Sequence, residues 1–457
     1  MADRAAARRV ETERGGPPRS LVEARKRRDA RAAAKPAGHP TRRERAGRPA
    51  VGVRAEIAPG MTGTGYSIVG VTLVMFLFGM VMIFSASSGT AFRVHGSSYY
   101  YLARQAVWFG VGLAAMCALA FMDYHRVAAI SPLLTVIAIA TLAAVPVIGT
   151  EAYGSKRSIE LGPIVVQPSE IAKFALLLLA AFVYSRRSER LDDWREIINP
   201  VLVATALACG LIIIEPDLGS MFIVAFSVFA VLYLAGAPVR KLMVLAGLGG
   251  GATVIFIFSS AYRKARFFSF LDPWSVAREG GFHIIQSMIA LGSGRITGLG
   301  LGMSRQKFFY LPNAHTDFIF SIIGEETGLA GTLAVLFLFA LFTYLGLKVA
   351  RRAPDSMGRV LAMGITCMLG VQAVINMGAA TGIMPITGIT LPFFSYGGSS
   401  LVICMCLAGI LINISRQEAG AGRGRGIRSG RAGGDLRRRN RGASPPPARA
   451  GRGARVA

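Results

Sequence analysis

The chain changes character within one stretch, Lys307-Phe308-Phe309-Tyr310-Leu311-Pro312-Asn313-Ala314-His315-Thr316-Asp317-Phe318-Ile319-Phe320. A polar segment rich in glycine and arginine ends there, and an apolar run begins that continues to about residue 347. About 20 apolar residues are enough to cross a bilayer as a helix, so this stretch marks a membrane boundary. Asp317 stands at that boundary, where an ionisable group is costly to desolvate and is therefore a functional candidate. The alternative is that Asp317 only caps the helix that follows, since Asp suits that position.

The composition extends this pattern to most of the chain. Of the 457 residues, 53% are hydrophobic and only 17% are charged, and the mean hydropathy is +0.48. A soluble chain of this length would need far more polar surface, so we expect an all-α polytopic membrane protein. Ten apolar runs are long enough to be transmembrane helices: about 66–86, 104–122, 127–149, 168–184, 198–214, 218–235, 241–259, 318–347, 358–380 and 391–414.

Positive charge is concentrated in two tails. Residues 1–65 hold sixteen Lys and Arg against seven Asp and Glu, and residues 416–457 hold twelve against two. Both tails are rich in Ala, Gly, Pro and Arg, cannot bury enough apolar surface to fold, and are expected to be disordered. They lack interleaved aromatic residues and a folded nucleic-acid module, so we expect no nucleic-acid partner. The membrane domain is expected over residues 66–415.

The short connections predict the orientation of the bundle. An even number of spans places both termini on one side, and the connections on that side are rich in Lys and Arg. The positive-inside rule therefore places both termini in the cytoplasm, and no cleavable signal peptide is expected before the first span. The five cysteines all fall in apolar segments and offer no disulfide framework and no metal-ligand spacing. The basic residues are Arg126; Arg186, Arg187, Arg190 and Arg195; Arg240 and Lys241; and Lys348, Arg351, Arg352 and Arg359.

Two of the connections on the opposite, external side carry charged residues at helix ends. The first ends in Gln167-Pro168-Ser169-Glu170, and Glu170 and Lys173 are close enough in sequence to pair on the helix that begins there. The second is the turn Glu215-Pro216-Asp217. Two acids at a helix junction invite a cation from Arg, Lys or a metal, and the alternative is that Asp217 only caps the next helix.

The longest external connection, residues 260–316 between the seventh and eighth spans, is unexpectedly basic. It holds seven Lys and Arg, including Lys307, against two acids. Positive charge should be scarce on this side, and such a departure favours an anionic ligand such as a phosphate, with anionic outer-leaflet lipid as the less specific alternative. The segment from Phe282 to Leu291, which contains Gln286, has helical apolar spacing but is too short to span. The glycines after it could suggest a nucleotide-binding loop, but no predicted strand precedes them, so we expect a mobile loop instead.

Together these motifs resemble the SEDS family of shape, elongation, division and sporulation proteins. The resemblance covers about residues 65–415. One position departs from the family pattern, because Ser158 stands where the family usually has Trp after Arg157. The matching residues are Phe84-Ser85-Ala86-Ser87-Ser88, Leu161-Gly162-Pro163, Gln167 to Glu170 with Lys173, Glu215-Pro216-Asp217-Leu218-Gly219, Leu311 to Phe320, Gly324-Glu325-Glu326, Gly382-Ile383-Met384-Pro385 and Leu391 to Ser400.

The resemblance implies a peptidoglycan glycosyltransferase of the bacterial cytoplasmic membrane, acting in septal cell-wall synthesis. Its substrate would be lipid II, an undecaprenyl-diphosphate-linked disaccharide peptide, and its partners a class B penicillin-binding protein transpeptidase and other divisome membrane proteins. The family's essential carboxylate falls on Asp317, and Arg157 and Lys173 match basic positions of its external cavity. The resemblance also implies a divalent cation, Mg²⁺ or Mn²⁺, with unknown ligands.

The chemistry of these residues agrees with that activity. A diphosphate leaves an anomeric carbon without a protonating acid, so the reaction needs a general base for the acceptor 4-hydroxyl and cations for the diphosphate. Asp317 is the expected base, and Arg157, Lys173 and Lys307 are the expected cations. His315 holds either the base or the acceptor, or only satisfies a loop carbonyl; Glu170 and Gln286 complete the expected substrate-binding set. A lipid II flippase and a non-catalytic divisome scaffold are the alternative functions.

Overall fold

The computed structural model describes residues 61–152, 155–162, 164–197, 200–259, 261–277, 281–308 and 310–418. The expected disordered tails, 1–65 and 416–457, lie almost entirely outside these residues, so their disorder stays a prediction. The described helices are α3 (Gly63–His95), α4 (Tyr100–Phe121), α5 (Tyr124–Ala129), α6 (Ser131–Ile148), α7 (Pro168–Arg187), α8 (Trp194–Ile197), α9 (Pro200–Ile214), α10 (Leu218–Leu234), α11 (Val239–Phe258), α12 (Ala261–Phe268), α13 (Phe282–Ser293), α14 (Ile319–Arg352), α15 (Ser356–Ala380) and a last helix, Gly398–Glu418.

The described part of the chain is mostly helical, and eight of its helices are long and apolar enough to cross a membrane. This confirms a polytopic helical membrane protein. The expected fifth and sixth spans correspond to α9 and α10, which have 15 and 17 residues. At 1.5 Å per residue they are about 22–26 Å long, shorter than a hydrocarbon core of about 30 Å. The count of ten spans therefore remains a prediction.

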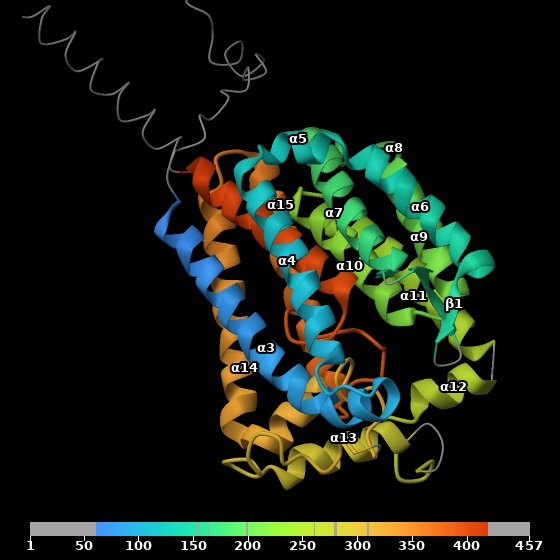
Figure 1. Cartoon of the computed structure of the whole chain (residues 1–457). Helices are drawn as coiled ribbons and strands as arrows, with labels where there is room; N and C mark the ends of the chain where they lie inside the picture. The colour runs from blue at the N-terminus through green and yellow to red at the C-terminus, as the bar shows by residue number, and fades with distance from the viewer. Residues whose placement is uncertain are drawn as a thin grey trace, which may run out of the picture. The chain divides into compact units, whose positions relative to one another are not determined.

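The helices form a bundle in which α7 and α15 are the central members (Figure 1). Side chains on every face of α7 between Ala172 and Ala181 are buried, and α7 packs against α6, α10 and α15. A helix that is apolar and buried all round belongs in the interior of a bundle. In contrast, α11 buries only Leu242 and Ile257, so most of its surface is left for lipid or a ligand.

A small β-sheet corrects the expectation of an all-α fold. Strands β1 (Thr150–Ala152), β2 (Ser155–Leu161) and β3 (Ile164–Val166) form a three-stranded antiparallel sheet between α6 and α7. Ile159 pairs with Val166 and Leu161 with Ile164, so β2 and β3 meet at a tight turn that contains Gly162 at φ 65°. Strands of three residues are too short to show a clear alternation in the sequence. The sheet matters because β2 carries Arg157.

The last part of the bundle also contains a break that the apolar pattern does not predict. Helix α14 is interrupted at Gly328, which has φ 67° and ψ −159°, a conformation almost restricted to glycine. The loop after α13 fills the gap in the helical hydrogen bonding. Leu299 N donates to Glu325 O at 3.0 Å, and Leu329 N donates to Arg295 O at 2.9 Å. The glycine-rich loop is therefore fastened to the helix that follows Asp317.

The chain connections gather at the two ends of the bundle (Figure 1). Helices α12 and α13 lie at one end, and α5 and α8 lie at the other. The end that carries α12 and α13 also receives the segment before α14, and the candidate site is formed there.

Candidate functional site

The backbone around Asp317 is held by three hydrogen bonds to successive carbonyl groups. His315 O accepts from Tyr396 N at 2.9 Å, Thr316 O from Ser395 Oγ at 2.6 Å, and Asp317 O from Asn376 Nδ2 at 2.8 Å. The donors come from α15 and from the segment before the last helix, so two distant parts of the sequence position Asp317. The N-cap of α14 is Phe318, one residue later than the capping alternative for Asp317 requires.

The structure brings Arg157 and Asp317 to the same place. Both side chains lie beside Gly388, a residue at φ 72° in the segment between α15 and the last helix. A Cβ atom added to Gly388 would lie 3.2 Å from Arg157 Nη1 and 3.8 Å from Asp317 Oδ2. The guanidinium and the carboxylate therefore border one small space, and the glycine at position 388 keeps that space open.

The turn between α9 and α10 forms another wall of the site. Arg157 Nη2 donates to Pro216 O at 2.7 Å, and Asp217 Oδ1 accepts from Ser220 N at 3.0 Å, so Asp217 caps α10 as its capping alternative predicted. Glu215 is only 2% exposed, and neither of its carboxyl oxygens has a hydrogen-bond partner among the described residues. Burial, and then the neighbouring Asp217, raise the pKa of Glu215 to about 8, although Arg157 opposes the shift. Glu215 is therefore mostly protonated at neutral pH.

Two lysines that were predicted to contact the substrate, Lys173 and Lys307, form buried ion pairs. Lys173 Nζ lies 2.7 Å from Glu170 Oε1 and donates to Gln372 Oε1 at 3.3 Å, and Lys173 and Glu170 are almost wholly buried. The predicted pairing is confirmed, but direct contact of either side chain with a substrate is not supported. Lys307 is also buried: its Nζ donates to Gly302 O at 2.6 Å and lies 3.3 Å from Glu326 Oε1. Glu326 compensates the charge of Lys307, which offsets the cost of burying its ammonium group.

The other two predicted contacts have different surroundings. His315 packs its ring 4.7 Å from the ring of Tyr101 and 5.6 Å from that of Tyr396. Burial lowers the pKa of His315 to about 4, so the imidazole is neutral at physiological pH and does not add positive charge to the site. Gln286 is half-buried on α13, which packs against α14 and α15.

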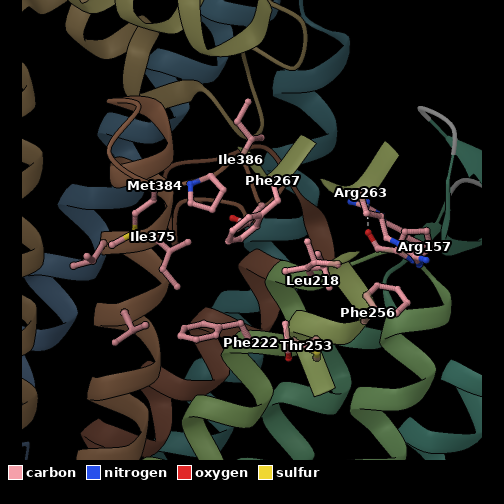
Figure 2. A pocket seen from close by; sticks show the side chains of 17 residues that line it. Arg157, Leu218, Phe222, Thr253, Phe256, Arg263, Phe267, Ile375, Met384 and Ile386 are labelled. Atoms are coloured by element: carbon pink, nitrogen blue, oxygen red, sulfur yellow. Dashed lines mark hydrogen bonds between the residues drawn. The ribbon is translucent and has the colours of Figure 1, made fainter. Parts of the chain in front are cut away.

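An apolar cavity of about 440 Å³ opens next to Arg157, between α10, α11, α12 and α15 (Figure 2). Arg157 and Arg263 are its two charged lining residues, and both lie at the same end of the cavity in Figure 2. Arg263 Nη2 donates to Ser259 Oγ at 2.9 Å, and its guanidinium lies 3.8 Å from the ring centre of Phe256. The rest of the lining is mainly apolar, including Phe222, Phe267, Val371, Ile375, Met384 and Ile386.

The two arginines share an unusual feature. Each has a buried Nε atom with no hydrogen-bond partner among the described residues. Two guanidinium groups at one end of an apolar cavity favour an anionic ligand there, which their Nη groups would contact because the Nε atoms are themselves buried. Arg263 is one of the seven basic residues of the external segment 260–316. The sequence does not predict that it lines the same cavity as Arg157, because the two are more than 100 residues apart.

Comparison with known proteins agrees with these features. The family model described as "Cell cycle protein", which covers FtsW, RodA and SpoVE, matches residues 66–420. The chain belongs to this family, the SEDS proteins. Among the relatives of this SEDS chain is a probable peptidoglycan glycosyltransferase FtsW of Geobacter sp. (strain M18), 37% identical over 78% of this chain and 98% of the relative. The stage V sporulation protein E of Bacillus subtilis (strain 168) is 38% identical over 76% of this chain and 95% of the relative.

Solved structures of SEDS proteins share the fold. One chain, from a peptidoglycan synthase complex described as coordinating polymerization and crosslinking, matches with a TM-score of 0.63 and 30% identity over 77% of this chain and 98% of its own length. The rod shape determining protein RodA of Thermus thermophilus matches with a TM-score of 0.57 and 29% identity, over 77% of this chain and 96% of its own length. A structure of the same RodA with one aspartate replaced by alanine gives the same TM-score.

The unusual state of Glu215 gives a test that needs no substrate. Its pKa is about 8 in the folded protein against an ordinary value of 4.5, so between these values the folded state holds a proton that the unfolded state releases. Stability should therefore fall as the pH rises from about 5 to about 8, and Glu215→Gln should remove much of that fall. The measurement is the thermal unfolding midpoint of the purified protein in detergent across this range.

Glu189→Gln, a neutralised carboxylate on the exposed segment after α7, is the matched control and should follow the wild type. Parallel pH curves for Glu215→Gln and the wild type would show that Glu215 does not hold this proton.

Proposed function

We propose that this SEDS protein is a peptidoglycan glycosyltransferase that polymerises lipid II into β-1,4 glycan strands at the outer face of the bacterial cytoplasmic membrane, during septal cell-wall synthesis. The observation that carries the proposal is the space shared by Asp317 and Arg157, which adjoins an apolar cavity with a second arginine. A carboxylate, two cations and an apolar chamber match the parts of a lipid-linked diphosphate sugar. Several relatives are named as probable peptidoglycan glycosyltransferases, which supports the general class of activity.

The cavity suits the lipid and diphosphate parts of such a substrate. Its apolar lining would take the first isoprene units of the lipid chain, since ligand cavities are largely apolar with a few placed polar groups. Arg157 and Arg263 would then face the diphosphate, and a guanidinium can donate two parallel hydrogen bonds to phosphate oxygens. The sugar would extend from the diphosphate past Arg157 toward Asp317.

In the proposed reaction Asp317 takes the proton from the 4-hydroxyl of the acceptor sugar. The hydroxyl oxygen attacks the anomeric carbon of the donor from the side opposite the diphosphate. A new C–O glycosidic bond forms, the anomeric C–O bond to phosphate breaks, and the lipid diphosphate leaves with the bonding electrons. The α linkage of the donor is thereby inverted to β. Arg157 would stabilise the negative charge that develops on the diphosphate, because a fixed cation in a dry site needs no rearrangement.

A divalent cation, Mg²⁺ or Mn²⁺, is part of the proposal. Within the described residues no group of three or more His, Cys, Asp and Glu side chains is arranged to hold a metal. Glu215 is the carboxylate beside Arg157 whose oxygens lack partners among the described residues, so it would be the protein ligand of an ion shared with substrate phosphates, whereas Asp217 is engaged as the cap of α10. Glu215 would have to release its proton to take that role. When bound, the ion would neutralise charge on the leaving group.

The proposed setting follows the sequence predictions. Ten spans with both termini in the cytoplasm would place α12, α13 and Asp317 on the outer side of the membrane, where the cell wall is made. A class B penicillin-binding protein is the proposed transpeptidase partner, with other divisome membrane proteins around it. The solved complex that coordinates polymerization and crosslinking supports this pairing.

A lipid II flippase remains the second candidate. It would need charged groups along a path from one leaflet to the other, and the buried pair Glu170 and Lys173 was its main support. The two residues neutralise each other and are sealed from solvent, whereas the exposed end of the site carries Arg157 and Arg263. This arrangement favours chemistry at one face over transport, and also over a scaffold without activity.

The proposed base is tested by neutralising Asp317. With the purified protein, its transpeptidase partner and labelled lipid II, Asp317→Asn and Asp317→Ala should lower glycan formation by about 10²- to 10⁴-fold, the usual contribution of a general base. Asp272→Asn, which removes an exposed carboxylate from the segment after α12, should polymerise at the wild-type rate. Normal glycan formation by both Asp317 variants would exclude the general-base role, and lipid II crossing liposomes without polymer would favour the flippase.

The proposed diphosphate contacts are tested by removing the two guanidinium groups. Arg157→Ala should lower kcat/KM more than about tenfold, because it faces both the diphosphate and the reacting carbon, and Arg263→Ala should mainly raise KM. Lys264→Ala, which removes an exposed cation next to Arg263 on α12, is the matched control and should change either constant less than about threefold. Equal effects of Arg263→Ala and Lys264→Ala would mean that general surface charge, not the cavity, attracts the substrate.

A further inference from the structure

Two buried carboxamides on α15 hold the segment that borders the site. Gln372 and Asn376 are one helical turn apart and are 1% and 2% exposed. Gln372 Nε2 donates to Thr390 O at 3.0 Å, and Asn376 Nδ2 donates to Ile389 O at 2.7 Å. The two amides therefore fix consecutive carbonyl groups of the segment directly after Gly388.

Asn376 has a second contact that Gln372 does not share. The same nitrogen donates to Asp317 O at 2.8 Å, so one NH₂ group joins two segments that are far apart in the sequence. Both neighbours are carbonyl oxygens, which can only accept, so the side-chain nitrogen and not the oxygen must face them. The two donated protons of Asn376 are both used.

These two bonds link the backbone segments on two sides of the space at the site. Asp317 carries the carboxylate on one side, and Gly388, next to Ile389, forms the other side against Arg157. Asn376 joins the backbone of Asp317 to the backbone of Ile389, the residue after Gly388. A change at Asn376 would therefore alter the separation of Asp317 from Gly388 and Arg157 without removing any group that touches the substrate.

One polar atom of Asn376 has no partner, which argues against a role in packing alone. Asn376 Oδ1 is buried and has no hydrogen-bond partner among the described residues. Leaving a buried acceptor unsatisfied is unfavourable, whereas the nitrogen satisfies two backbone carbonyl groups that would otherwise lack a donor. The asparagine is therefore better explained by what its nitrogen holds than by the space that it fills.

We propose that Asn376 is a positioning residue for the reaction: it fixes the Asp317 carboxylate relative to Gly388 and Arg157, and it does not itself contact the substrate. The inference rests on the proposed function. It also gives the buried pair Glu170 and Lys173 a place behind the site, because Lys173 Nζ donates to Gln372 Oε1 and so anchors the neighbouring amide.

The test compares two buried asparagines that each donate to backbone carbonyls. Asn376→Leu removes the two bonds at the site. Asn413→Leu, in the last helix, removes the bonds of Asn413 Nδ2 to the carbonyl groups of Leu119, Ala120 and Met122 and the bond that Asn413 Oδ1 accepts from Gln417, and Asn413 is as deeply buried. Both variants are purified with the transpeptidase partner, and kcat, KM for lipid II and the thermal unfolding midpoint are measured for each.

Asn376→Leu should lower kcat by about 10- to 100-fold and change KM less than about threefold, since a small displacement of a reacting group can cost this much in rate. Asn413→Leu should lower the thermal unfolding midpoint about as much as Asn376→Leu does, and it should leave kcat within about threefold of the wild type. If Asn376→Leu does not fold, Asn376→Ser, whose hydroxyl can donate at most one of the two bonds, is judged by the same criteria.

Three results would overturn the inference. The Asn376 variant could keep the wild-type kcat, or it could show only a raised KM. Alternatively, Asn413→Leu could lower kcat as much as the Asn376 variant does, which would tie the loss of rate to the loss of stability. Measuring Asp317→Asn in the same assay distinguishes failure of the positioning role from failure of the proposed function. If Asp317→Asn is inactive and the Asn376 variant is normal, only the positioning role fails. If Asp317→Asn polymerises normally, the proposed general base fails instead.

Discussion

The site depends on how the backbone from His315 to Asp317 is held at the end of the bundle. Three successive carbonyl groups accept hydrogen bonds from Tyr396, Ser395 and Asn376, and these donors belong to the last two membrane-domain segments of the chain. Buried backbone groups need such partners, so the loop cannot move without breaking several bonds at once. The carboxylate of Asp317 is thereby placed on a rigid support although it lies in a loop. This rigidity suits the proposed role of Asp317 as a general base, because proton transfer depends on a short and directed contact.

The buried charged residues fall into two groups, those that are paired with each other and those that lie near the cavity. Lys173 with Glu170, and Lys307 with Glu326, form closed pairs whose cost of burial is offset by direct contact and by further hydrogen bonds. Near the cavity the balance is different: Arg157 and Arg263 keep unsatisfied Nε atoms, and Glu215 keeps its proton. The closed pairs fix the helices and the glycine-rich loop, whereas the incompletely satisfied groups are the ones able to respond to a charged ligand.

Much of this organisation could be predicted from the sequence, and the part that could not has a physical reason. Apolar runs located the long helices, and Asp317 was found because a charged residue at a membrane boundary is conspicuous. Arg157 was assigned to the same site through the family resemblance, since its position in the sequence does not show that it lies near Asp317. The spacing of Glu170 and Lys173 predicted their pairing but not the burial of both side chains, and the partner of Lys307, Glu326, was missed because it lies on the helix that follows the loop. The break at Gly328 was missed because its hydrogen bonds come from a loop about 30 residues earlier, and Asn376 was missed because its two acceptors are backbone oxygens.

The central claim is that Asp317 works at the outer face of the membrane, on a substrate that presents its diphosphate to Arg157. The most direct test is the sidedness of the segment before it, measured with a membrane-impermeant thiol reagent. Ser275→Cys places a single thiol on an exposed position of this segment when the native cysteines have been replaced. The account predicts labelling in intact spheroplasts. Labelling only after the membrane is permeabilised would place the acid on the cytoplasmic side and would contradict the account.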